Sequence, residues 1–211
     1  MSERFDADAE FDRQVGNLVK LGYPDLIGRS SDDLLDLLEP LRGRAVEREI
    51  EPPTPARVPF VIVLSARIAK PTETMPLTTY NGRSGFIARD TKDIDEFPTH
   101  ESVELPAGDA WLIFDVDRGT QTLGAKPEEA RPRFARAGRS PLTIGEGIAF
   151  LTQFPESLEK NNCFQLPGTQ LDRKVPGLWI SERAPKLGFC WAGNRHTWLG
   201  HASCAERVAP S

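Results

Sequence analysis

The chain lacks the features of a secreted or membrane protein. Its three cysteines are an odd number and too few for a disulfide scaffold, which is typical of a reducing compartment. No window approaches the roughly 20 consecutive apolar residues that a membrane-spanning helix needs. The N-terminal stretch MSERFDADAEFDRQ is acidic and lacks the apolar centre of a secretory signal. We therefore predict a cytoplasmic protein without a membrane partner.

A dense basic surface is also lacking. The net charge is −5, and residues 1–51 contain thirteen acidic and seven basic residues. Nucleic-acid binding requires many phosphate contacts from a basic face, so we predict no nucleic-acid partner. From Arg173 onward the balance reverses to six basic and two acidic residues. This basic end indicates either a site for a small anionic molecule or ordinary solvated charge.

The N-terminal region has the pattern of two helices. Apolar residues from Phe11 to Val19 form one stripe at helical spacing, and Asp6 or Asp8 can cap its start. A second helix is expected from Ser31, and its many leucines predict burial on more than one side. We predict a helical hairpin over residues 1–51, packed on a main domain that covers residues 57–211. A proline-rich connector, EPPTPARVP, separates the two.

Short apolar segments in the rest of the chain predict strands. The run PFVIVLSA (59–66) is typical of a central strand covered on both faces, and AWLIFDV (110–116) predicts a second strong strand. Asn81-Gly82 predicts a hairpin turn. Further strands are expected at 163–166, 177–181 and 187–191. A short helix is predicted from Pro127, limited by Pro132, and a longer one after a capping box at 143–146. This order favours an α+β fold with a mixed, mainly antiparallel sheet, flanking helices and an N-terminal helical hairpin.

Two segments resemble a known family. RSPLTIGEGIAFLTQFPESLEKNNCFQLPG (139–168) and VPGLWISERAPKLGFCWAGNRHTWLGHASC (175–204) are similar to a family of uncharacterised bacterial proteins that share a domain of unknown function. The N-terminal helices and the VPFVIVL strand are similar to it as well, so the resemblance covers nearly the whole chain. It implies a single soluble unit, and it implies no activity or catalytic residues.

The segment CWAGNRHTWLGHASC (190–204) concentrates residues that can form a ligand pocket. Pockets for small molecules combine aromatic walls with a few polar groups. We predict Trp191 and Trp198 as walls, Asn194 and His196 as hydrogen-bonding groups, and Arg195 as the partner of an anionic group. Trp179 is expected in the core. The leading hypothesis is a small-molecule-binding protein or accessory enzyme.

The same segment offers ligands for zinc. Cys190, His196, His201 and Cys204 are residue types that zinc prefers, and four of them would complete a tetrahedral site. Their spacing matches no standard zinc finger. A zinc protein is therefore the first alternative, and a protein-interaction module that uses the N-terminal hairpin is the second.

Two catalytic arrangements are weaker alternatives. Asp115 and Asp117 end an apolar strand before Gly-Thr, which resembles the first motif of haloacid-dehalogenase-type phosphatases. Arg118 interrupts that motif, and no later pair of acids completes it. Cys163 is a candidate nucleophile with His196 as base and Asn194 as orienting amide, although a buried inert thiol explains it more simply.

Overall fold

The structure is a computed structural model that describes residues 5–48, 51–91 and 93–210. Its helices are α1 (Ala7–Lys20), α2 (Tyr23–Leu26), α3 (Ser31–Val46), α4 (Pro71–Thr74), α5 (Pro127–Arg136) and α6 (Ile144–Gln153). Short 3₁₀ helices are η1 (Met75–Leu77), η2 (Ile94–Glu96), η3 (Thr120–Thr122) and η4 (Pro155–Ser157). The strands are β1 (Arg57–Leu64), β2 (Thr79–Tyr80), β3 (Arg83–Ser84), β4 (Phe86–Ile87), β5 (Ala110–Asp117), β6 (Ser140–Pro141), β7 (Cys163–Gln165), β8 (Lys174–Ser181), β9 (Ala184–Trp191), β10 (Leu199–His201), β11 (Ser203–Cys204) and β12 (Glu206–Val208).

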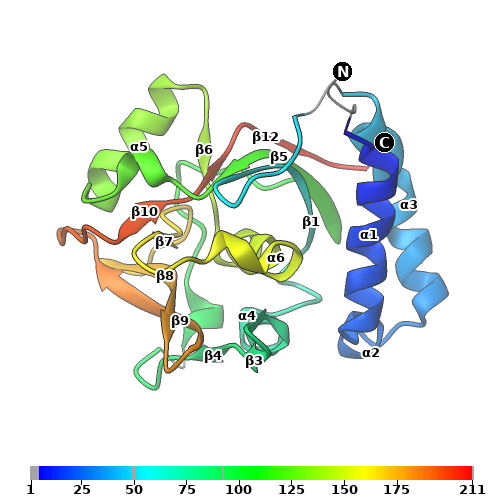
Figure 1. Ribbon diagram of the computed structural model, residues 1–211, viewed down its shortest axis with the longest axis horizontal. Coiled ribbons are helices and arrows are strands. Elements are labelled where there is room, and N and C mark those ends of the chain that lie inside the picture. The colour runs from blue at the N-terminus through cyan, green and yellow to red at the C-terminus, as the bar shows by residue number, and fades with distance from the viewer. Residues whose placement is uncertain (1–4, 49–50, 92, 211) are drawn as a thin grey trace.

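The elements form layers around two sheets (Figure 1). The first sheet has the order β1-β5-β11-β6, and β12 also pairs with β5. The second sheet has the order β10-β7-β8-β9-β4. The pairs β10–β7 and β4–β9 are parallel, whereas the other pairs are antiparallel. The α+β prediction with mainly antiparallel strands is confirmed, and the strands divide between two larger sheets and the small hairpin β2–β3.

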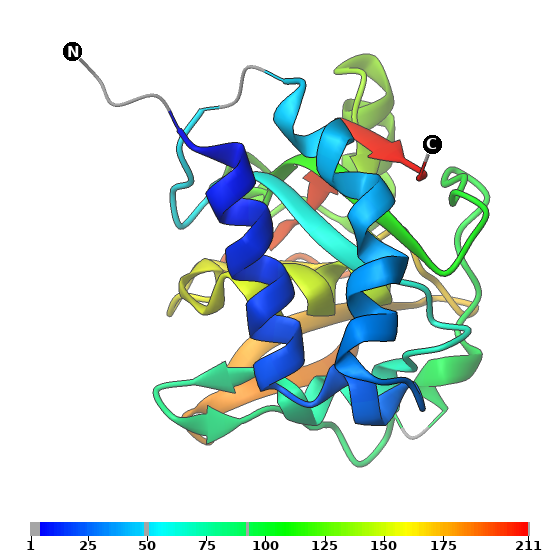
Figure 2. The same ribbon diagram turned by 90° about the vertical axis from the view of Figure 1, so that its right-hand side faces the viewer.

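Helices α1 and α3 lie side by side against the first sheet (Figure 2). Asp6 accepts the N–H groups of Asp8 and Ala9 at the start of α1, as predicted, and Ser30 caps α3. The inward stripe of α3 is fully buried and consists of Leu34, Leu38, Leu41 and Ala45. Leu35 is exposed, so the predicted burial of this helix on more than one side is wrong. This one stripe packs in a single apolar cluster with residues of α1 and of the first sheet.

Strand β1 is apolar and buried from Val58 to Leu64 because both of its faces are covered. Phe60 and Ile62 pack with the helical pair α1–α3, whereas Val61 and Val63 face a second core that includes α6. That second core continues to Phe164, Leu178 and Leu187 of the other sheet. Helix α6 therefore lies between the two sheets, at the centre of Figure 1. The predicted burial of both faces is confirmed, but the strand is not central, because β1 lies at the edge of the first sheet and pairs only with β5.

Helix α6 starts at the predicted capping box and packs closely on the second sheet. The Glu146 carboxylate accepts the backbone N–H of Thr143 at 2.8 Å. A Cβ atom on Gly147 would lie 2.2 Å from a methyl carbon of Leu166, so the glycine permits the close packing. Helix α5 continues through Pro132, which was expected to limit it. Pro132 is exposed, and so is Glu128, whose carbonyl group the proline leaves without a helical donor.

Part of the predicted helical unit 1–51 falls on residues without a described structure. Residues 1–4 and 49–50 belong to that unit and lie outside the described residues. Within the described ranges, no helix has the length and apolar character that crossing a membrane requires.

Candidate functional site

One end of the second sheet brings several segments together. Strand β7 begins at Cys163, which lies opposite Leu199 of the parallel strand β10. Strand β8 is antiparallel to β7 and pairs Leu178 with Phe164, so Trp179 lies beside Cys163. Strand β8 then turns back into β9 at this same end. The register therefore gathers the residues that precede β7 and β10 next to the β8–β9 turn.

A hollow with a volume of about 710 Å³ opens at this end of the sheet. We refer to it as the aromatic hollow. The β2–β3 hairpin, the turn before β7, strand β8 with its turn, and the residue before β10 all contribute to its wall. The aromatic and charged side chains of this wall are Tyr80, Arg83, Lys160, Trp179, Arg183 and Trp198.

Two indoles form a corner of the aromatic hollow. The ring centroids of Trp179 and Trp198 lie 6.2 Å apart, and the ring planes meet at 79°. His196 lies edge-on to Trp198 with a centroid distance of 5.6 Å. Lys186 contacts Trp179, with its Nζ atom 5.7 Å from the ring centroid. Edge-to-face aromatic pairs are favourable at these distances, so the corner is a pre-formed aromatic surface.

Gly188 sets the position of Trp179. A Cβ atom on this glycine would lie 2.5 Å from the Cη2 atom of Trp179. We expect Gly188→Ala to push the indole from its place and to lower the free energy of unfolding by about 1–3 kcal/mol, as is usual for overpacking. Urea denaturation measures the change. Gly16→Ala in helix α1 is the control, because its Cβ would meet no atom within 4 Å. Equal stability of both variants would contradict this role of Gly188.

Three cations surround the aromatic hollow. Arg83, Lys160 and Arg183 are exposed, and each lies in or next to a turn. Within the described part of the chain, none of the three has a carboxylate partner. The nearby carboxylate of Glu159 is already bound to Arg118 at 2.8 Å. The wall of the hollow therefore carries three cations that form no ion pair with the described residues.

The predicted pocket residues divide into two groups. Trp198 lines the aromatic hollow, and His196 packs against Trp198. Trp191 is 49% exposed and packs edge-on against Phe189 instead. Arg195 binds Glu129 and the carbonyl oxygen of Gly124, and Asn194 is exposed in the loop after β9. Trp179, which was expected in the core, is half-buried and lines the hollow.

The structure does not assemble the predicted zinc ligands. Cys190 lies within β9 of the second sheet, His201 is buried in β10, and Cys204 lies in β11 of the first sheet. His196 belongs to the loop between β9 and β10. Among the residues that the structure describes, no three His, Cys, Asp or Glu side chains gather in a way that could hold a metal ion. The four residues are close in sequence, but strand pairing separates them.

The cysteines have the properties of buried thiols. Burial raises the pKa of Cys163, and it raises the pKa of Cys190 to about 11. Burial, reinforced by the charge of Glu146, raises the pKa of Cys204 to about 12. The Cys163 thiol contacts the carbonyl oxygen of Glu159 at 3.3 Å, and its backbone N–H donates to the carbonyl oxygen of Trp198. The thiol that lines the hollow is thus protonated near neutral pH, which disfavours the nucleophile hypothesis.

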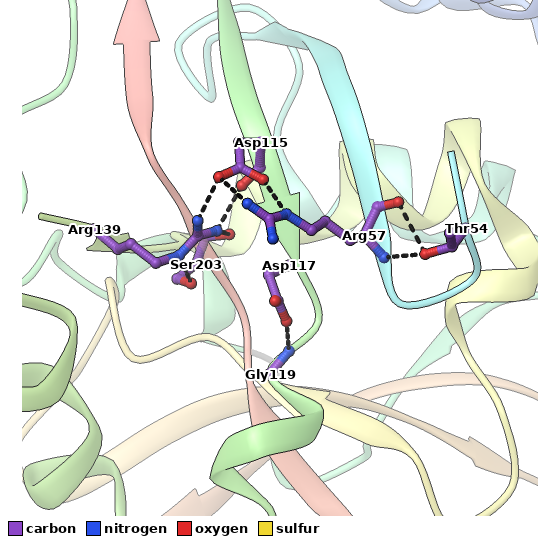
Figure 3. Close-up of polar contacts among 7 residues, drawn as sticks. All are labelled: Thr54, Arg57, Asp115, Asp117, Gly119, Arg139 and Ser203. Carbon is purple, nitrogen blue, oxygen red and sulfur yellow. Dashed lines mark hydrogen bonds and ion pairs between the residues drawn. The ribbon is translucent and has the colours of Figure 1, made fainter. Parts of the chain in front are cut away.

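Asp115 and Asp117 point to different partners (Figure 3). Asp115 binds Arg57, and it accepts from Arg139 at 2.7 Å. The two arginines lower the pKa of Asp115 despite its partial burial, which alone would raise it. Asp117 accepts the backbone N–H of Gly119 at 2.6 Å and so closes the turn after the strand. This arrangement does not fit a phosphatase motif, in which both carboxylates would face one metal ion.

Asp115 has a structural role in strand β5. Its φ of +52° is unusual for a residue other than glycine. Phe114 packs with the helical pair, whereas Val116 faces the interior core, so the alternation of side chains changes at Asp115. Arg139 also donates to the backbone oxygen of Asp115 and to Ser203 of the neighbouring strand. The two arginines therefore stabilise the positive-φ conformation of Asp115 in strand β5.

A smaller cavity of about 310 Å³ lies beside the start of helix α6. Its wall includes Trp111, Thr143, Ile144 and Thr169. Two polar groups of this wall already have partners, because Trp111 donates to Glu146 and the Ile144 N–H donates to Thr169. This cavity is therefore a weaker candidate for a binding site than the aromatic hollow.

Several residues of the hollow could not be identified from the sequence. Tyr80, Arg83 and Lys160 lie far from the C-terminal cluster along the chain. The Asn81-Gly82 turn could be predicted from the sequence, and it forms the tip of the hairpin that reaches the hollow. Without the strand register, that hairpin could not be placed next to Trp179.

The chain matches a known protein family. No curated protein sequence and no solved structure matches the chain. A family model described as "Family of unknown function (DUF5701)" matches residues 17–210. The match covers nearly the whole chain and confirms the resemblance found in the two C-terminal segments. The chain therefore belongs to this family of unknown function, DUF5701.

Proposed function

We propose that this protein binds a small, flat aromatic molecule in the aromatic hollow. The observation that carries the proposal is the corner made by Trp179 and Trp198 on the wall of an open space of about 710 Å³. Small-molecule sites typically have volumes of about 300–1,000 Å³ and aromatic walls. An indole that remains partly accessible offers a flat surface on which another ring can stack.

Binding is favoured over chemistry on the ligand. The Cys163 thiol lines the hollow, but burial raises its pKa and keeps it in the protonated form. The aromatic and charged side chains of the wall are indoles, a phenol and cations, which suit recognition. Asn81 and Asn161 add amide groups that can hydrogen-bond to a bound ring.

Indole NMR tests this proposal with internal controls. The chain has four tryptophans, and their Nε1–H resonances are assigned by Trp→Phe variants. A library of flat aromatic fragments is added at millimolar concentration to the ¹⁵N-labelled full chain. We expect binding fragments to shift the resonances of Trp179 and Trp198. Trp111 is buried against Glu146 and Trp191 lies outside the hollow, so their resonances should stay in place.

Two results would overturn the proposal. One is a library in which no fragment moves the Trp179 and Trp198 resonances together. The other is a set of binders that moves Trp191 or Trp111 instead, which would place the binding site elsewhere. Titration of any active fragment then gives its Kd.

Trp198 is expected to be essential for binding and dispensable for folding. It is half-buried at the wall of the hollow, so Trp198→Ala should abolish the thermal stabilisation that a bound fragment gives to the native protein. His196→Ala removes the ring that packs against Trp198 and should reduce the stabilisation as well. Trp191→Ala is the matched control and should retain it. Differential scanning fluorimetry with and without fragment measures these shifts. Unfolding of Trp198→Ala and His196→Ala without fragment would show that the cluster is structural.

The cellular setting is part of the proposal. All three cysteines are free thiols, and two of them are buried. Free buried thiols are compatible with a reducing compartment, which supports a cytoplasmic location.

A further inference from the structure

The three cations of the aromatic hollow come from three different turns. Arg83 follows the Asn81-Gly82 turn, Lys160 precedes Asn161 in the turn before β7, and Arg183 lies in the β8–β9 turn. The indoles of Trp179 and Trp198 belong to a strand and to the residue before one. Charge and aromatic surface are therefore supplied by separate parts of the same wall.

The β8–β9 turn has an unusual sequence for its geometry. Glu182 and Arg183, its two central residues, have φ angles of +54° and +63°. Two-residue hairpin turns with positive φ at both positions favour Asn-Gly, which is the sequence that the β2–β3 hairpin uses at Asn81-Gly82. A long charged side chain at Arg183 is thus kept in a conformation that favours glycine. Strained residues of this kind concentrate at binding sites, and Arg183 lines the hollow.

From these two observations we infer that the ligand carries an oxyanion, a phosphate ester or a carboxylate, next to its aromatic ring. This inference rests on the proposed function of the same hollow. The ring contacts Trp179 and Trp198, and the oxyanion is bound by Arg83, Lys160 and Arg183. Guanidinium groups bind phosphate and carboxylate through paired, charge-assisted hydrogen bonds. Three cations without carboxylate partners among the described residues provide the charge that such a group requires.

Matched pairs of probes test the inference. Adenosine 5′-monophosphate is compared with adenosine, and nicotinate with nicotinamide, so that each pair differs mainly in an anionic group. The Trp179 and Trp198 indole resonances report binding to the full chain at low and high salt. We expect the anionic member of at least one pair to bind about tenfold more tightly or better at low salt. The advantage should decrease at high salt. If the adenosine pair shows this advantage, the bound group is a phosphate ester. If the nicotinate pair shows it, the bound group is a carboxylate.

Two glycine variants isolate the charge of Arg183 from the shape of the turn. Arg183→Gly and Glu182→Gly each replace a residue of positive φ, so both should raise the melting temperature by about 2 °C. Arg183→Gly should reduce the preference for the anionic probe severalfold, whereas Glu182→Gly should retain it. Arg136→Ala, an exposed arginine at the end of α5, is the control for net charge and should also retain it.

The outcomes distinguish the two proposals. If neutral and anionic probes bind equally and both shift the indoles, the oxyanion inference fails and the aromatic site stands. An unchanged preference in Arg183→Gly, Arg83→Ala and Lys160→Ala also overturns the inference. If neither pair shifts the indoles and the fragment library is negative, the proposed function itself fails.

Discussion

Replacing Glu146 by alanine is expected to lower the free energy of unfolding by about 3–5 kcal/mol. The Glu146 carboxylate is 0% exposed, and it binds the Nε and Nη2 atoms of Arg207 at 2.6 and 2.8 Å. It also accepts the indole N–H of Trp111 and caps helix α6 through the N–H of Thr143. The substitution leaves the Arg207 guanidinium, which is 7% exposed, without its counter-charge. A buried charge without a partner is among the most destabilising features of a protein interior.

Urea denaturation at neutral pH measures this loss. Glu128→Ala is the control, because Glu128 is exposed and its ion pair with Lys126 is 3.7 Å long. Such surface pairs contribute less than about 1 kcal/mol. The double variant Glu146→Gln with Arg207→Met should recover part of the stability, since no unpaired charge remains. A change below about 1 kcal/mol for Glu146→Ala would show that water reaches Arg207 and that the pair is not a buried anchor.

This ion pair also explains how the C-terminal segment is held. Arg207 lies in β12, which pairs with β5, and it further donates to Ser140 and to the carbonyl oxygen of Pro141. One guanidinium thus joins the edge of the first sheet to the start of helix α6. The sequence predicted Glu146 as a capping residue and contained no sign of Arg207, which is 61 positions away. Local capping has a local signal, whereas the partner of a buried charge is set by the tertiary fold.

The predictable parts of the fold are those with a local cause. The helix caps at Asp6 and Glu146, the Asn81-Gly82 turn and the apolar runs of β1 and β5 each follow from neighbouring residues. The division into two sheets could not be predicted in this way, because it depends on which strands pair across long stretches of chain. The positive φ of Asp115 could not be predicted for the same reason, since its arginine partners come from β1 and from the residue before β6.

The candidate site was predicted only in part for the same reason. Trp191, Asn194 and Arg195 were grouped with Trp198 because they are near it in sequence. The β9–β10 loop directs Arg195 to Glu129 of helix α5 instead. Strand register places Trp179 beside Cys163, and the β2–β3 hairpin then reaches the same hollow from a distant part of the chain. The sequence indicated aromatic and basic residues near the C-terminus, and strand pairing decided which of them line the hollow.

Lowering the pH from 6.5 to 4 is expected to remove about 3 kcal/mol of stability through a single histidine, His201. Its ring is 0% exposed, and neither nitrogen has a hydrogen-bond partner among the described residues. Burial lowers the pKa of His201 to about 4, and Arg131 and Arg133 add to this effect, whereas the backbone at Thr122 and the charge of Glu129 oppose it. The unfolded chain protonates the same ring near pH 6.5. The unfolded state therefore binds more protons between these values, and stability falls as the pH decreases through that window.

The backbone of His201 is closely packed in the native fold. A Cβ atom on Gly119, whose φ is +87°, would lie 2.1 Å from the backbone oxygen of His201, so the two chain segments are in direct contact. His201→Leu should flatten the stability profile between pH 6.5 and 4.5 and should be more stable than the native protein at pH 5. His100→Gln is the control and should retain most of the slope, because that ring is only partly buried. Carboxylates with a lowered pKa, such as Asp115, lose their contribution at lower pH and do not produce this slope. An equally steep profile in His201→Leu would assign the acid sensitivity to other groups and would show that the unpartnered ring is hydrated in solution.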